Sequence, residues 1–539
     1  MPKLYPCTVT VDIIESEKSS PPSGMDADEL EKQRNQEKLK SWRLVDKKYI
    51  SFYQSLTKLK IIMTKHLKRL RFGVPALFVL TLMFQTTAFL AMGQSDTSER
   101  PNIVIIFTDD QGYADVGVYG AKGFTTPNID QLAREGRRFT NFYVGESVCS
   151  PSRASLMTGC YPQRVGIDGF VFFPTRGENA GPGPNGLHPN EITIAEMLKK
   201  QGYTTACVGK WHLGDAKPFL PTQQGFDEYF GLPYSNDMWN GPEGKANPNN
   251  PFPPLPLYDG DKIIETEPNQ RFLTHRYTER AVDFIERNRE KPFFLYLPHS
   301  MPHIPLHVHP DFEGRSEQGP YGDVIQEIDW SVGQVLKALK DCGIEEKTLV
   351  IFSTDNGPWL TMGKRGGQAV PLRDGKQTKY DGGHRVPCLM RYPGKIKANS
   401  VGEEMISSID LFPTIAKISG GKVPNDRSID GIEAWDYFSG KSEISPRDTY
   451  FYNKKVVRHG KWKLFLPGDY TELNPEKLNN RPVKYENIRL YNLDIDIGET
   501  SDVSDDHPET VAALKKLLID YVEDLDKNSR PLGLSANFE

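Results

Sequence analysis

Cysteine is scarce in this sequence, and there is no excess of positive charge. Six cysteines among 539 residues are too few for a disulfide framework. A formal net charge of -5 gives no electrostatic case for nucleic acid as a partner. No internal repeat is visible. The hydrophobic fraction of 37% and the charged fraction of 25% suit a globular protein, and the length indicates two or more packed units.

Residues 63–93 have the basic, apolar and small segments of a secretory signal peptide, in that order. The small residues around Ala91-Met92-Gly93 provide a cleavage site, so we expect a secreted or periplasmic protein. The alternative is a membrane anchor over residues 74–92, because that stretch approaches the ~20 residues needed to span a bilayer. Polar residues at 85–87 interrupt the stretch and favour the signal peptide.

Residues 1–62 are polar, charged and weakly periodic. Because a signal peptide belongs at the start of a chain, we expect translation to begin at Met63 and the preceding residues to be a gene-model extension. The alternative is a disordered cytoplasmic tail ahead of an anchor.

Strands alternate with helices from residue 101 onward. Apolar runs without alternation predict strands buried on both faces, at residues 102–108, 203–209, 293–297 and 348–353. Apolar stripes at helical spacing predict helices over residues 127–135 and 323–340. This order predicts an α/β fold with a large mixed, mostly parallel sheet flanked by helices. Residues 240–270, rich in proline and asparagine, are expected to form a long loop.

A shift in composition near residue 400 suggests a boundary between two parts of the chain. We expect a catalytic domain at 100–400 and a smaller C-terminal α/β subdomain at 401–539. The subdomain is predicted to contain a helix starting at 410–414, short antiparallel strands at 450–466 and 488–493, and an amphipathic helix at 508–525.

Polar side chains follow each buried strand at its carboxyl end, where open α/β sheets bind ligands. They are Asp109 and Asp110, Lys210 and His212, His299 and His303, and Asp355 and Asn356. One aspartate after a strand is usually a turn residue, but four such groups at one sheet edge indicate a site. The oxygen ligands suit Ca²⁺, with Mg²⁺ as the alternative, because a zinc hydrolase would need several histidines.

Residues 149–159 predict a helix with an anion site at its start. Ser150 is expected to cap the helix and Pro151 to take its first position. Cys149 would then lie just ahead of backbone N–H groups that favour an anion, and Arg153 adds a guanidinium one turn later. Considered alone, such a cysteine is more often a buried free thiol.

Two motifs resemble those of a known family. Cys149-Ser150-Pro151-Ser152-Arg153 is similar to the first sulfatase signature, Cys-x-Pro-Ser-Arg, and residues 202–214 are similar to the second. Both motifs are long and specific, and the resemblance extends from about residue 101 to the end. It is greatest to the arylsulfatase A-like group, partly through residues 233–237. The resemblance implies the alkaline phosphatase-like fold and hydrolysis of sulfate monoesters.

The resemblance also implies roles for the matching residues. Cys149 would be oxidised to Cα-formylglycine by a formylglycine-generating enzyme, and the hydrated aldehyde would form a covalent sulfoenzyme intermediate. Arg153 would orient residue 149, and Lys210 and His212 would contact it, with His212 as the base. Residue 149 would bind Ca²⁺ together with a set of oxygen ligands, namely Asp109, Asp110, Asp355 and Asn356.

Further positions match the family's contacts to substrate. His303 and Lys376 match its sulfate-binding histidine and lysine, and would protonate or stabilise the leaving oxygen. Lys210 and Ser235 would also contact the substrate. His299 lies close in sequence to His303, which we prefer for this role.

Two other functions compete with sulfate hydrolysis. One is an esterase of the same superfold that acts on phosphate or phosphonate esters. The other is a non-catalytic glycan-binding protein, which would lack a site residue; none is missing, although Asp381 stands where the family more usually has glutamate. The substrate would be a sulfated sugar, glycan or lipid, selected by loops such as 170–190 and 235–270.

Overall fold

The computed structural model describes residues 100–241, 247 and 249–538. They belong to one compact unit that begins at residue 96. The features predicted for residues 1–93 lie outside this part. Within it, no helix combines the length and apolar character needed to cross a membrane. The five cysteines that it includes are all free.

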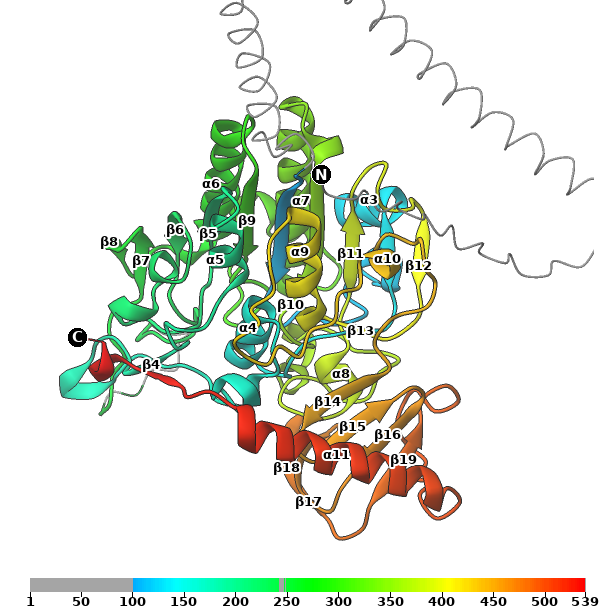
Figure 1. Ribbon diagram of the computed structural model, residues 1–539. Helices are drawn as coiled ribbons and strands as arrows, with labels where there is room; N and C mark the ends of the chain where they lie inside the picture. The colour runs from blue at the N-terminus through cyan, green and yellow to red at the C-terminus, as the bar shows by residue number, and fades with distance from the viewer. Residues whose placement is uncertain (1–99, 242–246, 248, 539) are drawn as a thin grey trace, which may run out of the picture. The chain divides into compact units, whose positions relative to one another are not determined.

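A ten-stranded mixed sheet forms the centre of the unit (Figure 1). From one edge to the other its strands are β12 (Ser400–Gly402), β2 (Arg137–Phe139), β11 (Cys388–Arg391), β10 (Thr348–Thr354), β1 (Asn102–Thr108), β9 (Phe293–Pro298), β5 (Thr204–Val208), β6 (Glu228–Gly231), β7 (Pro256–Asp259) and β8 (Lys262–Thr266). The strands from β10 to β6 run parallel to one another. Antiparallel pairs flank them on both sides.

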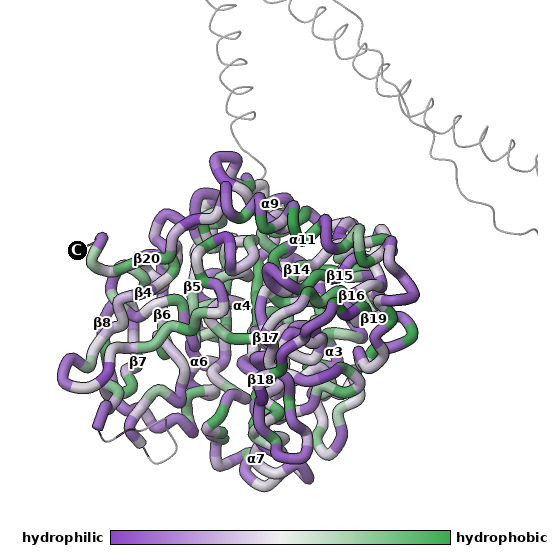
Figure 2. The backbone as a smooth tube through the Cα atoms, turned by 90° about the horizontal axis from the view of Figure 1, so that it is seen from below, coloured by the Kyte–Doolittle hydropathy of each residue, from purple (hydrophilic) through white to green (hydrophobic). Residues whose placement is uncertain are grey.

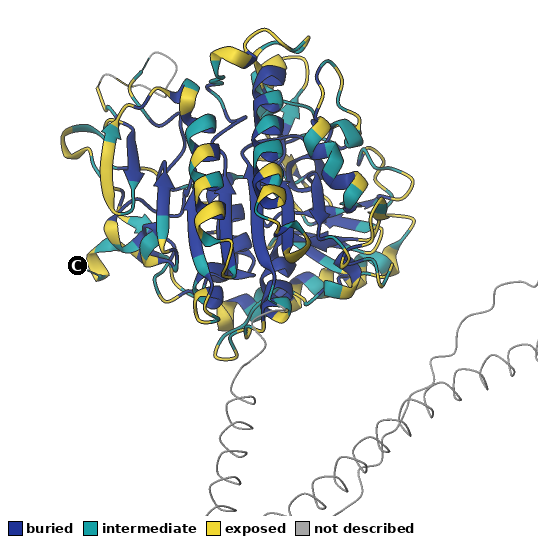
Figure 3. Cartoon of the chain, turned by 90° about the horizontal axis from the view of Figure 1, so that it is seen from above, coloured by how far each residue is buried: buried dark blue, intermediate teal, exposed yellow. Residues whose placement is uncertain are grey.

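Successive side chains of β1 enter two cores, one on each face of the sheet. Ile103 and Ile105 pack on the side of α4 (Cys149–Thr158), α5 (Ile194–Lys199) and α9 (Leu411–Ser419). Val104 and Ile106 pack on the side of α3 (Pro127–Glu135), α6 (Leu273–Asn288) and α7 (Pro320–Asp341). Figure 3 shows dark blue strands behind helices that turn a yellow side outward. Burial on both faces explains the uninterrupted apolar runs in the sequence.

The C-terminal part contains a four-stranded antiparallel sheet of β14 (Thr449–Asn453), β15 (Val456–His459), β16 (Trp462–Phe465) and β19 (Arg489–Asn492). Helix α11 (Pro508–Asn528) lies against it (Figure 2). Leu514 and Leu518 of this helix share a buried cluster with Val457 and Leu464. Between β16 and β19, β17 (Gly468–Asn474) and β18 (Asn479–Tyr485) form a hairpin. Shorter elements are β3 (Phe142–Tyr143), β4 (Asn185–Gly186), α8 (Asp381–His384), β13 (Ile406–Ser407), α10 (Trp435–Phe438) and β20 (Gly533–Leu534).

The structure confirms the predicted mixed sheet, its flanking helices and the C-terminal antiparallel strands. The prediction of a long loop at 240–270 is wrong for its second half, where β7 and β8 form a hairpin at the sheet edge. Gly260 supplies the left-handed conformation (φ 61°) that this turn uses. The domain boundary near residue 400 stays a prediction; beyond it, β12 and β13 pair with β2 and β3.

Asp329 of α7 caps the start of α3. Its Oδ1 accepts hydrogen bonds from the backbone N–H groups of Asn128 (2.9 Å) and Ile129 (2.8 Å). We expect Asp329→Ala to lower the free energy of unfolding by about 1–3 kcal/mol, because two donors would lose their acceptor. Asp341→Ala, on the same helix but with an exposed carboxylate, should change it by about 0.5 kcal/mol or less. Denaturant titration measures both, and equal effects would contradict the capping role.

Candidate active site

The carboxyl ends of β1, β5, β9 and β10 lead into one buried cluster beside the start of α4. The backbone N–H of Asp110, after β1, donates to Asp355 Oδ1, after β10, at 3.1 Å. Asp109, Asp110, Asp355 and Asn356 are all at most 2% exposed. The structure therefore brings together the four candidate oxygen ligands that the strand-end pattern predicted to lie at one sheet edge.

Cys149 lies at the centre of this cluster. Its Sγ is 3.4 Å from Asp109 Oδ1, 4.0 Å from Asp110 Oδ1 and 3.4 Å from Lys376 Nζ. The side chain comes from the first turn of α4 and is buried. A cationic and an anionic group thus both contact the thiol.

The predicted cap of α4 is wrong. The helix begins at Cys149 with Val148 as its N-cap, and no side chain caps it. The first turn is closed instead by the N–H of Ser152, which donates to the Val148 carbonyl at 3.2 Å. Ser150 therefore lies inside the helix, and its Oγ accepts a hydrogen bond from the N–H of Phe172 at 3.2 Å.

Three cationic side chains neutralise the three carboxylates. The pairs are Arg153 with Asp355, Lys210 with Asp109, and Lys376 with Asp110. Arg153 donates through Nε to Asp355 Oδ2 at 3.0 Å and through Nη1 to the Lys210 carbonyl at 2.9 Å. Lys376 Nζ lies 2.6 Å from Asp110 Oδ1. Without a further cation, the formal charges of these six groups balance.

The oxygen atoms of the cluster fit a hard divalent cation. Burial raises the pKa of Asp110 and of Asp355, and neighbouring carboxylates raise both further, although the cationic side chains oppose this. Asn356 donates through Nδ2 to Asp110 Oδ1 at 2.7 Å, while its buried Oδ1 has no hydrogen-bond partner in the described part of the chain. One ligand atom each from Asp109, Asp110, Cys149 and His303 lie within 4.8 Å of one another. Crowded carboxylates with an unused amide oxygen suit Ca²⁺.

The two histidines that follow β9 lie in different surroundings. His303 Nε2 is 3.6 Å from Asp110 Oδ2, at the cluster. His299 is buried beneath α7, where its Nε2 is 3.3 Å from Ser331 Oγ. The structure therefore places His303 at the cluster and His299 away from it.

His212 and Ser235 lie beside Lys210. Lys210 Nζ donates to Ser235 Oγ at 3.3 Å. His212 Nε2 is 3.1 Å from the Phe172 carbonyl oxygen, so this ring nitrogen bonds to the backbone and not to Cys149. Burial lowers the pKa of His212 well below its ordinary value, and the nearby Lys210 lowers it further.

The backbone at the site is unusual at three positions. Asp110 (φ 66°) and His212 (φ 60°) adopt left-handed conformations, which cost on the order of 1–3 kcal/mol each. Gly209, between β5 and Lys210, has φ 132°, and a Cβ there would lie 1.9 Å from the Pro298 carbonyl oxygen. A glycine is therefore required where the chain turns to bring Lys210 to Asp109.

Sequence reasoning missed Trp359, which flanks the site. Its ring centroid is 4.7 Å from Lys376 Nζ and 5.4 Å from the His303 ring. An aromatic face at this distance stabilises a lysine ammonium. Trp359 follows Asp355 by four residues, so extending the strand-end search beyond polar residues would have found it.

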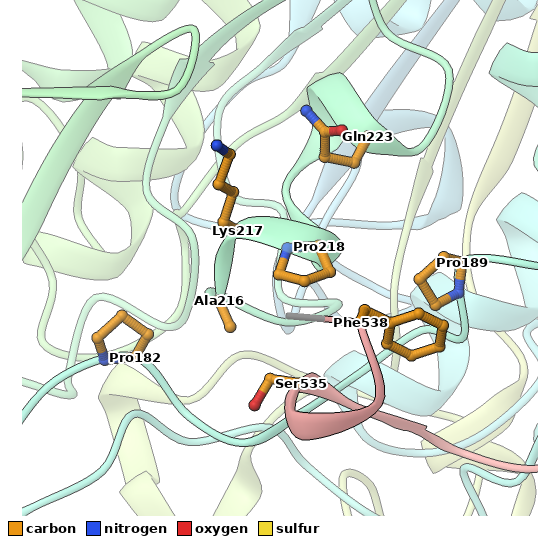
Figure 4. Close-up of a pocket in the computed structure, with 8 residues that line it drawn as sticks. All are labelled: Pro182, Pro189, Ala216, Lys217, Pro218, Gln223, Ser535 and Phe538. Atoms are coloured by element: carbon orange, nitrogen blue, oxygen red, sulfur yellow. The ribbon is translucent and has the colours of Figure 1, made fainter.

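The pocket shown in Figure 4 is separate from the cluster around Cys149. It has a volume of about 790 Å³, and its lining includes Pro182, Ala216, Lys217 and Phe538 but none of the clustered residues. The segment from Lys210 to Lys217 connects the pocket to the cluster along the chain.

Known proteins resemble this chain over most of its length. The family model described as Sulfatase matches residues 101–421, and the one described as N-sulphoglucosamine sulphohydrolase, C-terminal, matches residues 374–525. Arylsulfatase G of Rattus norvegicus is 35% identical over 497 residues, 83% of this chain and 91% of the relative. Arylsulfatase A of Homo sapiens is 39% identical over 455 residues, 77% of this chain and 87% of the relative.

A solved structure shares the fold. The crystal structure of Ps i-CgsB in complex with k-i-k-neocarrahexaose has a TM-score of 0.65 at 29% identity and covers 80% of this chain and 95% of its own. The match confirms the predicted fold, and the relatives show that the protein is a sulfuric ester hydrolase. The chain belongs to the sulfatase family, in its arylsulfatase-like group.

Proposed function

We propose that the protein hydrolyses sulfate esters of sugars through a formylglycine formed from Cys149, with Ca²⁺ bound beside it. The observation that carries this proposal is the position of Cys149 Sγ, 3.4 Å from both Asp109 Oδ1 and Lys376 Nζ. Burial raises the pKa of the thiol well above its ordinary value, and Asp109 adds to this. The unmodified thiol would therefore be a poor nucleophile at neutral pH, which supports its conversion to another group.

The residues around position 149 would position and activate it. A hydrated formylglycine would supply one hydroxyl to attack sulfur and a second whose deprotonation expels the sulfate. Arg153, which is fixed by Asp355 and the Lys210 carbonyl, would hold residue 149 in place. His212, whose lowered pKa favours the unprotonated ring, would be the base that accepts a proton during this cycle.

Other side chains would bind the sulfate group and assist the leaving alcohol. Lys210 and Lys376 would contact sulfate oxygens and offset the charge of the transition state, and Ser235 would contact the substrate next to Lys210. His303 would protonate the leaving oxygen, with Lys376 beside it. Trp359, which contacts both His303 and Lys376, would restrict their movement.

Asp109, Asp110, Asp355 and Asn356, together with residue 149, would hold Ca²⁺, which would stabilise negative charge on the sulfate. The carboxylate oxygens that converge at the cluster and the unused Oδ1 of Asn356 support this part of the proposal. Once a divalent cation is added, the site carries net positive charge, which attracts an anionic ester.

A sulfated sugar is the substrate class that the comparison with Ps i-CgsB supports, since that protein's complex contains an oligosaccharide. The predicted signal peptide at 63–93, outside the described residues, would direct the enzyme to the periplasm or out of the cell. A formylglycine-generating enzyme would be its partner during maturation.

Conversion of Cys149 can be tested directly by mass spectrometry of the peptide that carries it. We expect an aldehyde in place of the thiol in active enzyme, and Cys149→Ala should lower kcat by at least ~10³-fold, because the nucleophile is lost. Cys388→Ala, which removes a buried thiol outside the cluster, should leave the kcat of the enzyme unchanged. Fully active enzyme with an intact thiol at position 149 would refute the proposal.

Removal of the metal provides a second test. Ca²⁺ added to chelator-treated protein should raise Tm by several degrees, because it binds only the folded state. Asn356→Ala should raise the Ca²⁺ concentration that gives half of this Tm increase by about tenfold or more, since the unused Oδ1 is a proposed ligand. Asn528→Ala, at the exposed end of α11, is the control. A Tm that does not respond to Ca²⁺ would exclude a calcium site.

The choice of ester distinguishes the competing functions. We expect a higher kcat/KM for 4-nitrophenyl sulfate than for 4-nitrophenyl phosphate, because the proposed metal ligands are mainly oxygen atoms, whereas a zinc phosphohydrolase would need several histidines. Faster hydrolysis of the phosphate would favour the related esterase. Hydrolysis of neither ester, with retained glycan binding, would favour the non-catalytic alternative.

A further inference from the structure

Lys376 is carried by a loop whose backbone is strained on both sides of it. Asp374 (φ 56°) and Gln377 (φ 72°) both adopt left-handed conformations. Such residues persist only where surrounding contacts hold them. On the site side, the N–H of Lys376 donates to the Pro358 carbonyl at 2.9 Å and that of Gln377 to the Ser147 carbonyl at 3.0 Å.

The hairpin β17–β18 of the C-terminal part holds the start of this loop. Asp374 Oδ2 accepts a hydrogen bond from the N–H of Leu473 at 3.1 Å. Arg373 donates to Glu472 Oε1 at 3.2 Å, and Asn480 Nδ2 donates to Gln377 Oε1 at 2.9 Å. Both left-handed residues therefore have side chains bonded to this hairpin.

Three buried charged residues hold the end of the loop. Lys463 Nζ of β16 lies 3.0 Å from Asp381 Oδ1 and 2.6 Å from Glu499 Oε1. Glu499 Oε2 accepts a hydrogen bond from the N–H of Asp381 at 2.8 Å, and the Glu499 carbonyl accepts one from Arg373. All three side chains are fully buried. Lys463 and Glu499 therefore link the C-terminal sheet to both ends of the loop.

We propose that Lys463 and Glu499 are positioning residues for Lys376, which they hold against Asp110 and residue 149 through Asp381 and Arg373. The physical basis is that a buried charge must keep its partners, so movement of Asp381 would leave Lys463 and Glu499 poorly compensated. The inference rests on the role proposed for Lys376. It assigns Glu499, which lies between β19 and α11, an indirect effect on the site through Asp381 and Arg373.

If Lys463 only stabilised the fold, any substitution that destabilises β16 to the same extent would lower activity equally. The neighbouring Leu464 points to the other face of β16, into the cluster with Leu514 and Leu518 of α11. Leu464→Ala therefore destabilises the same strand without touching the loop. It is the matched control for Lys463→Met, which removes the charge and keeps the side chain's length.

A double-mutant cycle measured as kcat/KM for 4-nitrophenyl sulfate tests the proposal. Lys376→Ala should lower kcat/KM by about 10²–10³-fold, because a charge that stabilises the transition state is lost. Lys463→Met should lower it by about tenfold or more, but by less than about twofold in the Lys376→Ala background, since Lys463 acts through Lys376. Leu464→Ala should lower Tm and leave kcat/KM within about twofold. Glu499→Gln, which preserves the shape of the side chain, should also lower kcat/KM only when Lys376 is present. It replaces Lys463→Met in the cycle if that variant does not fold.

The outcomes separate the two claims. Additive effects of Lys463→Met and Lys376→Ala would overturn the positioning role and leave the role of Lys376 intact. Glu499→Gln with unchanged kcat/KM would also overturn it. If Lys376→Ala itself keeps full activity, the role of Lys376 in the proposed function fails, and the positioning role fails with it.

Discussion

The pairing of buried carboxylates with buried cations at the carboxyl ends of the parallel strands is the constraint on which the site depends. Asp109, Asp110 and Asp355 would be unstable as isolated ions in a dry interior. Arg153, from α4, and Lys210, from the turn after β5, compensate two of them. Breaking such a pair typically costs about 3–5 kcal/mol, because the remaining charge stays buried. The helix, the strand ends and the Lys376 loop are thereby held in one arrangement.

Much of this arrangement could be predicted from the sequence. The strand 102–108 and the helix 127–135 were predicted to the residue, because an uninterrupted apolar run and an apolar stripe at helical spacing are local signals. The grouping of Asp109 with Asp355 followed from parallel strands, whose carboxyl ends share one edge of a sheet. These inferences need only the spacing of apolar and polar residues along the sequence.

Features that depend on distant contacts could not be predicted in this way. Serine is a common helix cap, but the Ser150 hydroxyl accepts a hydrogen bond from the N–H of Phe172, a contact that no local rule identifies. The hairpin β7–β8 was missed because prolines and asparagines around it outweighed two short strands at a sheet edge. The pairing of Lys463 with Asp381 joins residues 82 positions apart, and only the folded chain shows it.

Burial of the Cys149 side chain also constrains the order of events in biosynthesis. The thiol is 3% exposed and is surrounded by side chains from four separate strand ends and a loop, so a second protein cannot reach it in the folded chain. Any enzymatic oxidation at this position must therefore act on the nascent or unfolded polypeptide. Under the proposed function, maturation and folding would then compete in time, and a chain that folds first would remain unmodified.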